Sequence, residues 1–118
     1  MPESPFDQPG IEVTIDQIVA DEADGRFVLI DVREPHEWEA GRIEGATHVP
    51  MDQLGPQIDR FDPEVTIVFQ CLVGGRSAMA AQAFRGQGFD AWSLAGGIQE
   101  WDERGLPLVP EGGQVVGH

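Results

Sequence analysis

Three short, mostly apolar runs separated by helix-forming segments are the feature that most constrains how this chain can fold. The runs are Phe27–Val32, Thr66–Phe69 and Ala91–Leu94. Short apolar runs of this kind are typical of strands that are buried on both faces of a sheet. Strands that alternate with helices form mainly parallel sheets. The sequence therefore predicts an α/β domain built around a mostly parallel sheet.

The segments between the runs carry the helix signals. Thr14 and Gln17 fit a capping box at the start of a helix that we expect to reach about Asp24. The alanine-rich segment 77–85 has a strong helix propensity and is followed by glycines. We also expect short helices over residues 35–40 and 98–104 and a brief strand over 47–50, with 51–60 left ambiguous.

The domain organisation follows from length and from the composition of the two ends. A chain of 118 residues is long enough for one ordinary domain, which we place at residues 11–109. Residues 1–10 hold three prolines and a glycine and are expected to form a flexible leader. The glycine-rich residues 110–118 are expected to form a flexible tail.

Charge and hydropathy exclude several classes of partner. The net charge is −14, and all seven basic residues are arginines, so the field of the protein repels nucleic acids and anionic membranes. No apolar run approaches the roughly 20 residues of a membrane-spanning helix. The N-terminus also lacks the basic and apolar regions of a signal peptide. We therefore expect a cytoplasmic protein that binds neither nucleic acids nor membranes.

The chain contains one cysteine, Cys71, which excludes a disulfide within the chain and a zinc cluster of cysteines. A lone cysteine is most often a small buried apolar residue, so only its surroundings can indicate chemistry. His36 and His48 have no metal-ligand partners at suitable spacing, and His118 is terminal. We expect no metal and no cofactor.

The surroundings of Cys71 do indicate chemistry. The residue follows a predicted strand and begins the loop Cys71-Leu72-Val73-Gly74-Gly75-Arg76, with Ser77 and a helix directly after it. Both glycines permit positive φ, which lets successive N–H groups point inward as an anion-binding nest. A helix N-terminus and a nearby cation lower the pKa of a cysteine from about 8.5 to roughly 3.5–7.5. Cys71 is therefore predicted to be a thiolate nucleophile, with Arg76 facing a bound anion and Ser77 capping the helix.

Four motifs in sequence order resemble those of the rhodanese family over roughly residues 11–108. One is the loop that begins at Cys71. The others are Leu29–Glu34 followed by Trp38, the segment Gly41–Ala46, and Leu94–Trp101, which is similar to the closing Leu-x-Gly-Gly-x-x-x-Trp of the family. The resemblance implies a five-stranded, mostly parallel sheet with helices on both sides.

The resemblance also implies a sulfurtransferase that works through a persulfide on Cys71. The sulfur would come from a donor such as thiosulfate and pass to cyanide, a thiol or a protein. Since the chain has no second cysteine, the acceptor must come from outside it. Substrate would be bound by the rest of the loop, namely Leu72, Val73, Gly74, Gly75, Arg76 and Ser77.

Two alternatives stay open. Related loops often have an arginine where this chain has Leu72, and Arg76 is the one cation of the loop. A sulfur-relay or protein-binding module with little small-molecule turnover is therefore the second hypothesis. A phosphatase or arsenate reductase is a minor third, because phosphate-transferring relatives place five residues between the cysteine and the arginine, where this chain has four.

Structural roles are expected for the other polar and aromatic candidates. We interpret Asp31 and Arg33 as partners that fix neighbouring loops, and Glu34 as structural with them. The three tryptophans, Trp38, Trp92 and Trp101, are expected to pack in the core or at its rim. The Gly96-Gly97 pair is expected to form a turn that brings the last helix beside the cysteine loop.

Overall fold

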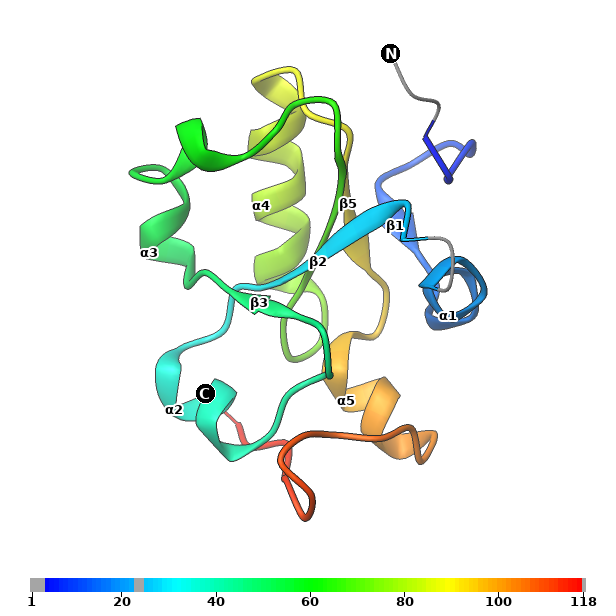
Figure 1. Cartoon of the computed structure of the whole chain (residues 1–118), viewed down its shortest axis with the longest axis vertical. Coiled ribbons are helices and arrows are strands. Elements are labelled where there is room, and N and C mark those ends of the chain that lie inside the picture. Colours follow the sequence, from blue (N-terminus) through cyan, green and yellow to red (C-terminus); the bar gives the residue numbers. More distant parts are fainter. Residues whose placement is uncertain (1–3, 23–24, 118) are drawn as a thin grey trace.

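A computed structural model describes residues 4–22 and 25–117 of the chain. Its centre is a five-stranded sheet in the order β1-β5-β4-β2-β3, in which every pair of strands is parallel (Figure 1). The strands are β1 (Glu12–Val13), β2 (Phe27–Asp31), β3 (Thr47–His48), β4 (Thr66–Gln70) and β5 (Ala91–Leu94). The predicted mostly parallel, five-stranded sheet is confirmed.

Helices cover both faces of this sheet, as the resemblance implied. One face packs against α3 (Met51–Leu54), η1 (Ile58–Arg60) and α4 (Gly75–Gly86). The other face packs against α1 (Ile15–Glu22) and α5 (Gly97–Glu103). The short helix α2 (Pro35–Ala40) follows β2. The ambiguous segment 51–60 thus divides into a helical turn and a 3-10 turn.

The central strand β4 shows why the apolar runs become buried strands. All five of its residues are buried. Ile67 and Phe69 belong to the core cluster beneath α4, whereas Val68 belongs to the cluster beneath α1 and α5. Alternation of side chains along a strand sends neighbouring residues to opposite faces, so an uninterrupted apolar run fits a sheet that is covered twice.

Helix α1 begins with the predicted capping box. The N–H of Gln17 donates to the hydroxyl of Thr14 at 3.2 Å, and the N–H of Thr14 donates to the side-chain carbonyl of Gln17 at 2.9 Å. These bonds satisfy backbone donors that a helix start leaves without partners. The predicted end of this helix near Asp24 lies outside the described residues. No helix in the described residues is long and apolar enough to cross a membrane.

Both ends of the chain make more contacts with the domain than their composition indicated. Phe6, inside the predicted leader, is only 4% exposed and packs against the rings of Phe27 and Trp92. In the predicted tail, the N–H of Gln114 donates to the carbonyl of Ala40 at 2.7 Å. Segments on either side of 11–109 therefore complete the packing of the domain.

Candidate active site

Cys71 lies directly after β4, at the carboxyl ends of the parallel strands. Open α/β sheets place their ligand sites there, because the loops that follow the strands meet at these ends. Helix α4 begins only four residues later, at Gly75, just before the start predicted near Arg76 or Ser77. Gly74 is the residue before the helix and has φ +117°, whereas Gly75 is not among the glycines with positive φ. Of the two glycines that permit positive φ, Gly74 adopts it and Gly75 does not.

Three hydrogen-bonding groups surround the sulfur of Cys71. The N–H groups of Gly74 and Ser77 lie 3.2 and 3.4 Å from Sγ, and the hydroxyl of Ser77 lies 3.5 Å from it. The residue is only 1% exposed. Burial raises the pKa of the thiol, but hydrogen bonds from Ser77, Gly74 and the backbone of Arg76 outweigh it, so the pKa of Cys71 is lowered. This arrangement stabilises a thiolate.

Ser77 does not cap α4, contrary to the prediction, because Gly74 occupies the cap position without a side-chain bond. The early start of the helix places Ser77 inside its first turn, with its hydroxyl directed toward the sulfur. That oxygen also lies 3.2 Å from the carbonyl of Gly74 and 2.7 Å from the hydroxyl of Ser93. Ser93 comes from β5 and is completely buried. It is a site residue that the sequence reasoning missed.

Arg76 is paired with a buried carboxylate. Its guanidinium donates to both oxygens of Glu37 in α2, at 2.8 and 3.0 Å. Glu37 is completely buried, and burial raises the pKa of its carboxyl, but the hydrogen bond from Arg76 and further favourable contacts hold the pKa below its usual value. The side chain that was expected to face a bound anion is therefore held by Glu37, a partner that the sequence reasoning missed.

The N-terminal end of α5 is hydrogen-bonded to the backbone of the cysteine loop. The N–H groups of Ile98 and Gln99 donate to the carbonyls of Cys71 and Leu72, at 2.9 and 3.0 Å. Gly97 has φ +58°, and a Cβ on it would lie 2.4 Å from the Leu72 carbonyl oxygen. Only glycine permits this close approach of two backbones. The predicted role of the Gly96-Gly97 turn is confirmed.

The remaining loop residues form an apolar outer surface. Leu72 is half-buried and packs against the cluster under α5, whereas Val73 is 54% exposed. The structure thus brings Gly74 and Ser77 to the sulfur and directs the Arg76 side chain to Glu37. Leu72 and Val73 do not contribute a hydrogen bond to the sulfur. Gly75 only begins the helix.

The other sequence candidates have structural roles. The guanidinium of Arg33 donates to the carboxylate of Asp31 at 2.8 Å and to the carbonyl of Gly41 at 2.8 Å, and both side chains are completely buried. Trp92 and Trp101 are core residues, and Trp38 stacks on His48 with ring centres 4.8 Å apart. In the described part of the chain, no group of three His, Cys, Asp or Glu residues could hold a metal ion. His118 lies outside that part.

Comparison with known proteins agrees with this architecture. The family model of the rhodanese-like domain matches residues 14–104. A rhodanese-related protein from Thermoplasma volcanium is 26% identical, with a TM-score of 0.78, over 85% of this chain and 98% of that one. The human single-domain sulfurtransferase TSTD1 is 30% identical, with a TM-score of 0.74, over 81% and 98% of the two chains.

The same fold also occurs as one part of a larger protein. The reduced Bacillus anthracis protein CoADR-RHD is 30% identical, with a TM-score of 0.68, over 80% of this chain but only 17% of that one. The family match covers most of the present sequence and includes the loop that surrounds Cys71. The chain belongs to the rhodanese-like domain family.

Proposed function

We propose that the protein is a sulfurtransferase that carries sulfane sulfur as a persulfide on Cys71. The observation that carries this proposal is the convergence of two N–H donors, those of Gly74 and Ser77, on one sulfur atom, with the Ser77 hydroxyl 3.5 Å from it. Such donors stabilise a thiolate before the reaction, and a persulfide anion after it, because both carry negative charge inside the same ring. Family membership supports the same chemistry.

The reaction is a pair of displacements at sulfur. The Cys71 thiolate attacks the outer sulfur of a donor such as thiosulfate, the donor S–S bond breaks, and its electron pair leaves with sulfite. An acceptor thiolate then attacks the outer sulfur of the persulfide, and the Cys71 thiolate leaves. Cyanide replaces the thiol acceptor in an assay. Because Cys71 is 1% exposed, we propose that the loop shifts when the donor enters.

Three observations favour a second function, a sulfur relay between proteins with little turnover of small molecules. Glu37 forms an ion pair with the guanidinium of Arg76, so the side-chain cation of the loop already has an anionic partner. Val73 presents an apolar side chain on the outer surface of the loop, and the chain carries a net charge of −14. These features suit a protein persulfide better than a small dianion.

Steady-state formation of thiocyanate from thiosulfate and cyanide separates the two functions. An enzyme of the first kind turns over with thiosulfate and loses this activity in Cys71→Ser. A relay module gives little thiocyanate from thiosulfate, yet it accepts sulfur from a persulfidated donor protein and passes it to cyanide. If neither donor supports transfer through Cys71, both functions are wrong.

A further inference from the structure

The sheet has an incompletely covered edge far along the chain from Cys71. Strand β2 pairs with β4 along all of Phe27–Asp31, whereas β3 pairs only with Ile30 and Asp31. Among the described residues, no strand lies on the outer side of 27–29. The chain turns before it reaches this place, as the hydrogen bond from the Ala46 N–H to the Ile43 carbonyl shows. An apolar strand segment is therefore left open at its edge.

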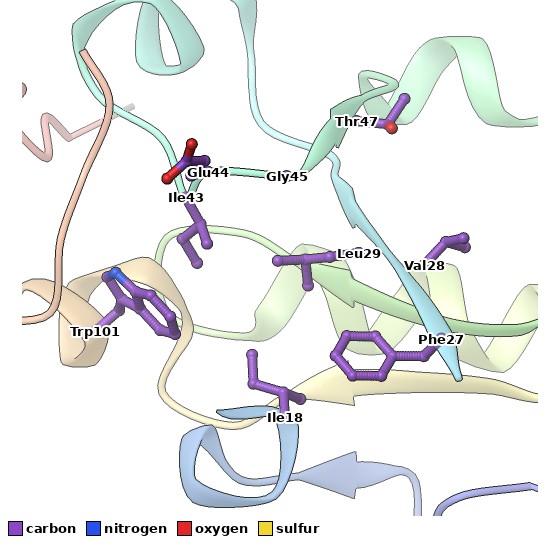
Figure 2. Close-up of a pocket in the computed structure, with 9 residues that line it drawn as sticks. All are labelled: Ile18, Phe27, Val28, Leu29, Ile43, Glu44, Gly45, Thr47 and Trp101. Carbon is purple, nitrogen blue, oxygen red and sulfur yellow. The ribbon is translucent and has the colours of Figure 1, made fainter. Parts of the chain in front are cut away.

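A cavity lies on each face of the sheet beside this edge. The first has a volume of about 200 Å³ and is lined by apolar side chains from β2, α1, α5 and the turn before β3. Figure 2 shows the side chains of Ile18, Phe27, Leu29, Ile43 and Trp101 directed toward this hollow. The second cavity, of about 220 Å³, is lined by the apolar Ile30, Phe61, Val65 and Ile67 and by one residue of each charge, Arg60 and Asp62. Val28 and Thr47 line both cavities, so the open edge runs between them.

This geometry fits the addition of a strand. Side chains alternate between the two faces along a strand, so successive residues of a peptide placed beside β2 would enter the two cavities in turn. Exposed edges of natural sheets are commonly protected by charged residues, prolines or bulges. Here the edge residues are Phe27, Val28 and Leu29, and Val28 is 41% exposed. Residues 27–29 thus lack the charged residues and prolines that commonly prevent another strand from pairing with such an edge.

We propose that the β2 edge binds an extended segment of a partner protein, with one large aliphatic side chain in the first cavity. An apolar cavity of roughly 150 Å³ accommodates a benzene molecule, so about 200 Å³ suits a leucine side chain. The segment should carry basic residues on either side of its apolar centre, since the chain has a net charge of −14 and Glu44 lines the first cavity.

A second copy of this chain is a poorer occupant of the edge. Three open residues cannot provide the roughly 1,200 Å² that a stable interface buries. Two copies would also bring together surfaces of the same strong negative charge. Both arguments favour a short peptide segment over self-association.

The test uses nuclear magnetic resonance of the labelled full chain titrated with the blocked peptide Lys-Thr-Val-Leu-Val-Thr-Lys. We expect saturable shifts of the backbone amides of residues 27–29 and 43–47 and of the Trp101 indole. Replacing the central leucine of the peptide with alanine should weaken binding about tenfold or more, because the cavity then stays unfilled. The absence of shifts, shifts confined to the Cys71 loop, or equal binding of the two peptides would each overturn the proposal.

Two valine variants make the test specific. Val28→Lys places a charge on the edge and should abolish peptide binding. Val19→Lys makes the same change on α1, at a residue that is 45% exposed, and should leave binding unchanged. Both variants should keep the wild-type rate of Cys71 alkylation. The proposal fails if Val28→Lys still binds, or if sedimentation velocity shows self-association that Val28→Lys removes, because the occupant would then be a second copy.

Discussion

The guanidinium of Arg76 and the carboxylate of Glu37 form a two-point ion pair between the cysteine loop and α2, at 2.8 and 3.0 Å. The pair ties the first turn of α4 to a helix that follows a different strand. It also places a buried negative charge beside the side-chain cation of the loop. The thiolate of Cys71 is therefore stabilised mainly by N–H and hydroxyl groups, and Arg76 contributes at longer range.

Removal of the buried carboxylate should destabilise the fold. Glu37→Ala leaves Arg76 without this anion in a partly buried place, and we expect the free energy of unfolding to fall by roughly 2–4 kcal/mol. Asp16→Ala is the matched control, since Asp16 pairs with Arg104 on the surface, where such pairs contribute about 0–1 kcal/mol. Denaturant unfolding at neutral pH measures both variants. Equal losses of unfolding free energy in the two variants would show that the buried Glu37–Arg76 pair stabilises the fold no more than the surface pair does.

The stabilising effect of Glu37 should depend on pH. The pKa of the Glu37 carboxyl is lower in the folded protein than its ordinary value. The ionised carboxylate therefore stabilises the folded state more than the protonated carboxyl does. The contribution is complete above the unfolded pKa, about 4.3, and is lost as the pH falls through the lower folded value. The difference in unfolding free energy between wild type and Glu37→Gln should shrink over that acidic window. A difference that is constant with pH would contradict this assignment.

Loss of the Arg76 charge should raise the pKa of Cys71. Arg76→Ala removes a positive charge that interacts with the thiolate, although Glu37 already offsets part of it. The pH profile of iodoacetamide alkylation should move to higher pH, while Arg60→Ala, in η1, should leave it unchanged. An unmoved profile in Arg76→Ala would show that the charge of Arg76 does not affect the pKa of Cys71.

The two buried serines should affect the pKa of Cys71 to different degrees, because Ser77 contacts the sulfur directly and Ser93 contacts Ser77. Ser77→Ala removes the hydroxyl at 3.5 Å from Sγ and should raise the pKa of Cys71. Ser93→Ala removes only the hydroxyl that lies 2.7 Å from that of Ser77, so its effect should be in the same direction but smaller. Ultraviolet titration of the thiolate measures both. A larger shift in Ser93→Ala would contradict the arrangement.

The contact of α5 with the loop should not tolerate a side chain. Gly97→Ala combines φ +58° with a Cβ 2.4 Å from the Leu72 carbonyl oxygen, so we expect a loss of at least about 2 kcal/mol and slower alkylation of Cys71. Gly86→Ala is the control, because nothing lies within 4 Å of a Cβ there and its φ is not positive. It should change stability by no more than about 1 kcal/mol. A stable Gly97→Ala protein with normal alkylation would contradict the close contact.

Local patterns in the sequence were sufficient to predict most of the fold. The apolar runs indicated buried strands because β4 is covered on both faces, and the Thr14–Gln17 pair indicated a helix start because its bonds are formed within four residues. The Cys71 loop was recognisable for the same reason. Its donors come from Gly74 and Ser77, which are close in sequence.

The missed features depend on contacts between distant segments. Glu37 lies 39 residues from Arg76, and Ser93 lies 16 residues from Ser77, so no local pattern pairs them. The place of Phe6 in the core likewise depends on Phe27 and Trp92, which only the folded sheet brings together.

The role of Ser77 was mistaken for a local reason. Gly74, with φ +117°, allows α4 to begin earlier than a serine cap would.

Intact mass spectrometry of the persulfide tests the central claim most directly. After incubation with thiosulfate or with a persulfidated donor protein, the wild-type chain should gain the mass of one sulfur atom, removable by cyanide or dithiothreitol. Cys71→Ser should gain nothing. No adduct on the wild-type chain from either donor, or an equal adduct on Cys71→Ser, would contradict the claim that Cys71 carries the sulfur.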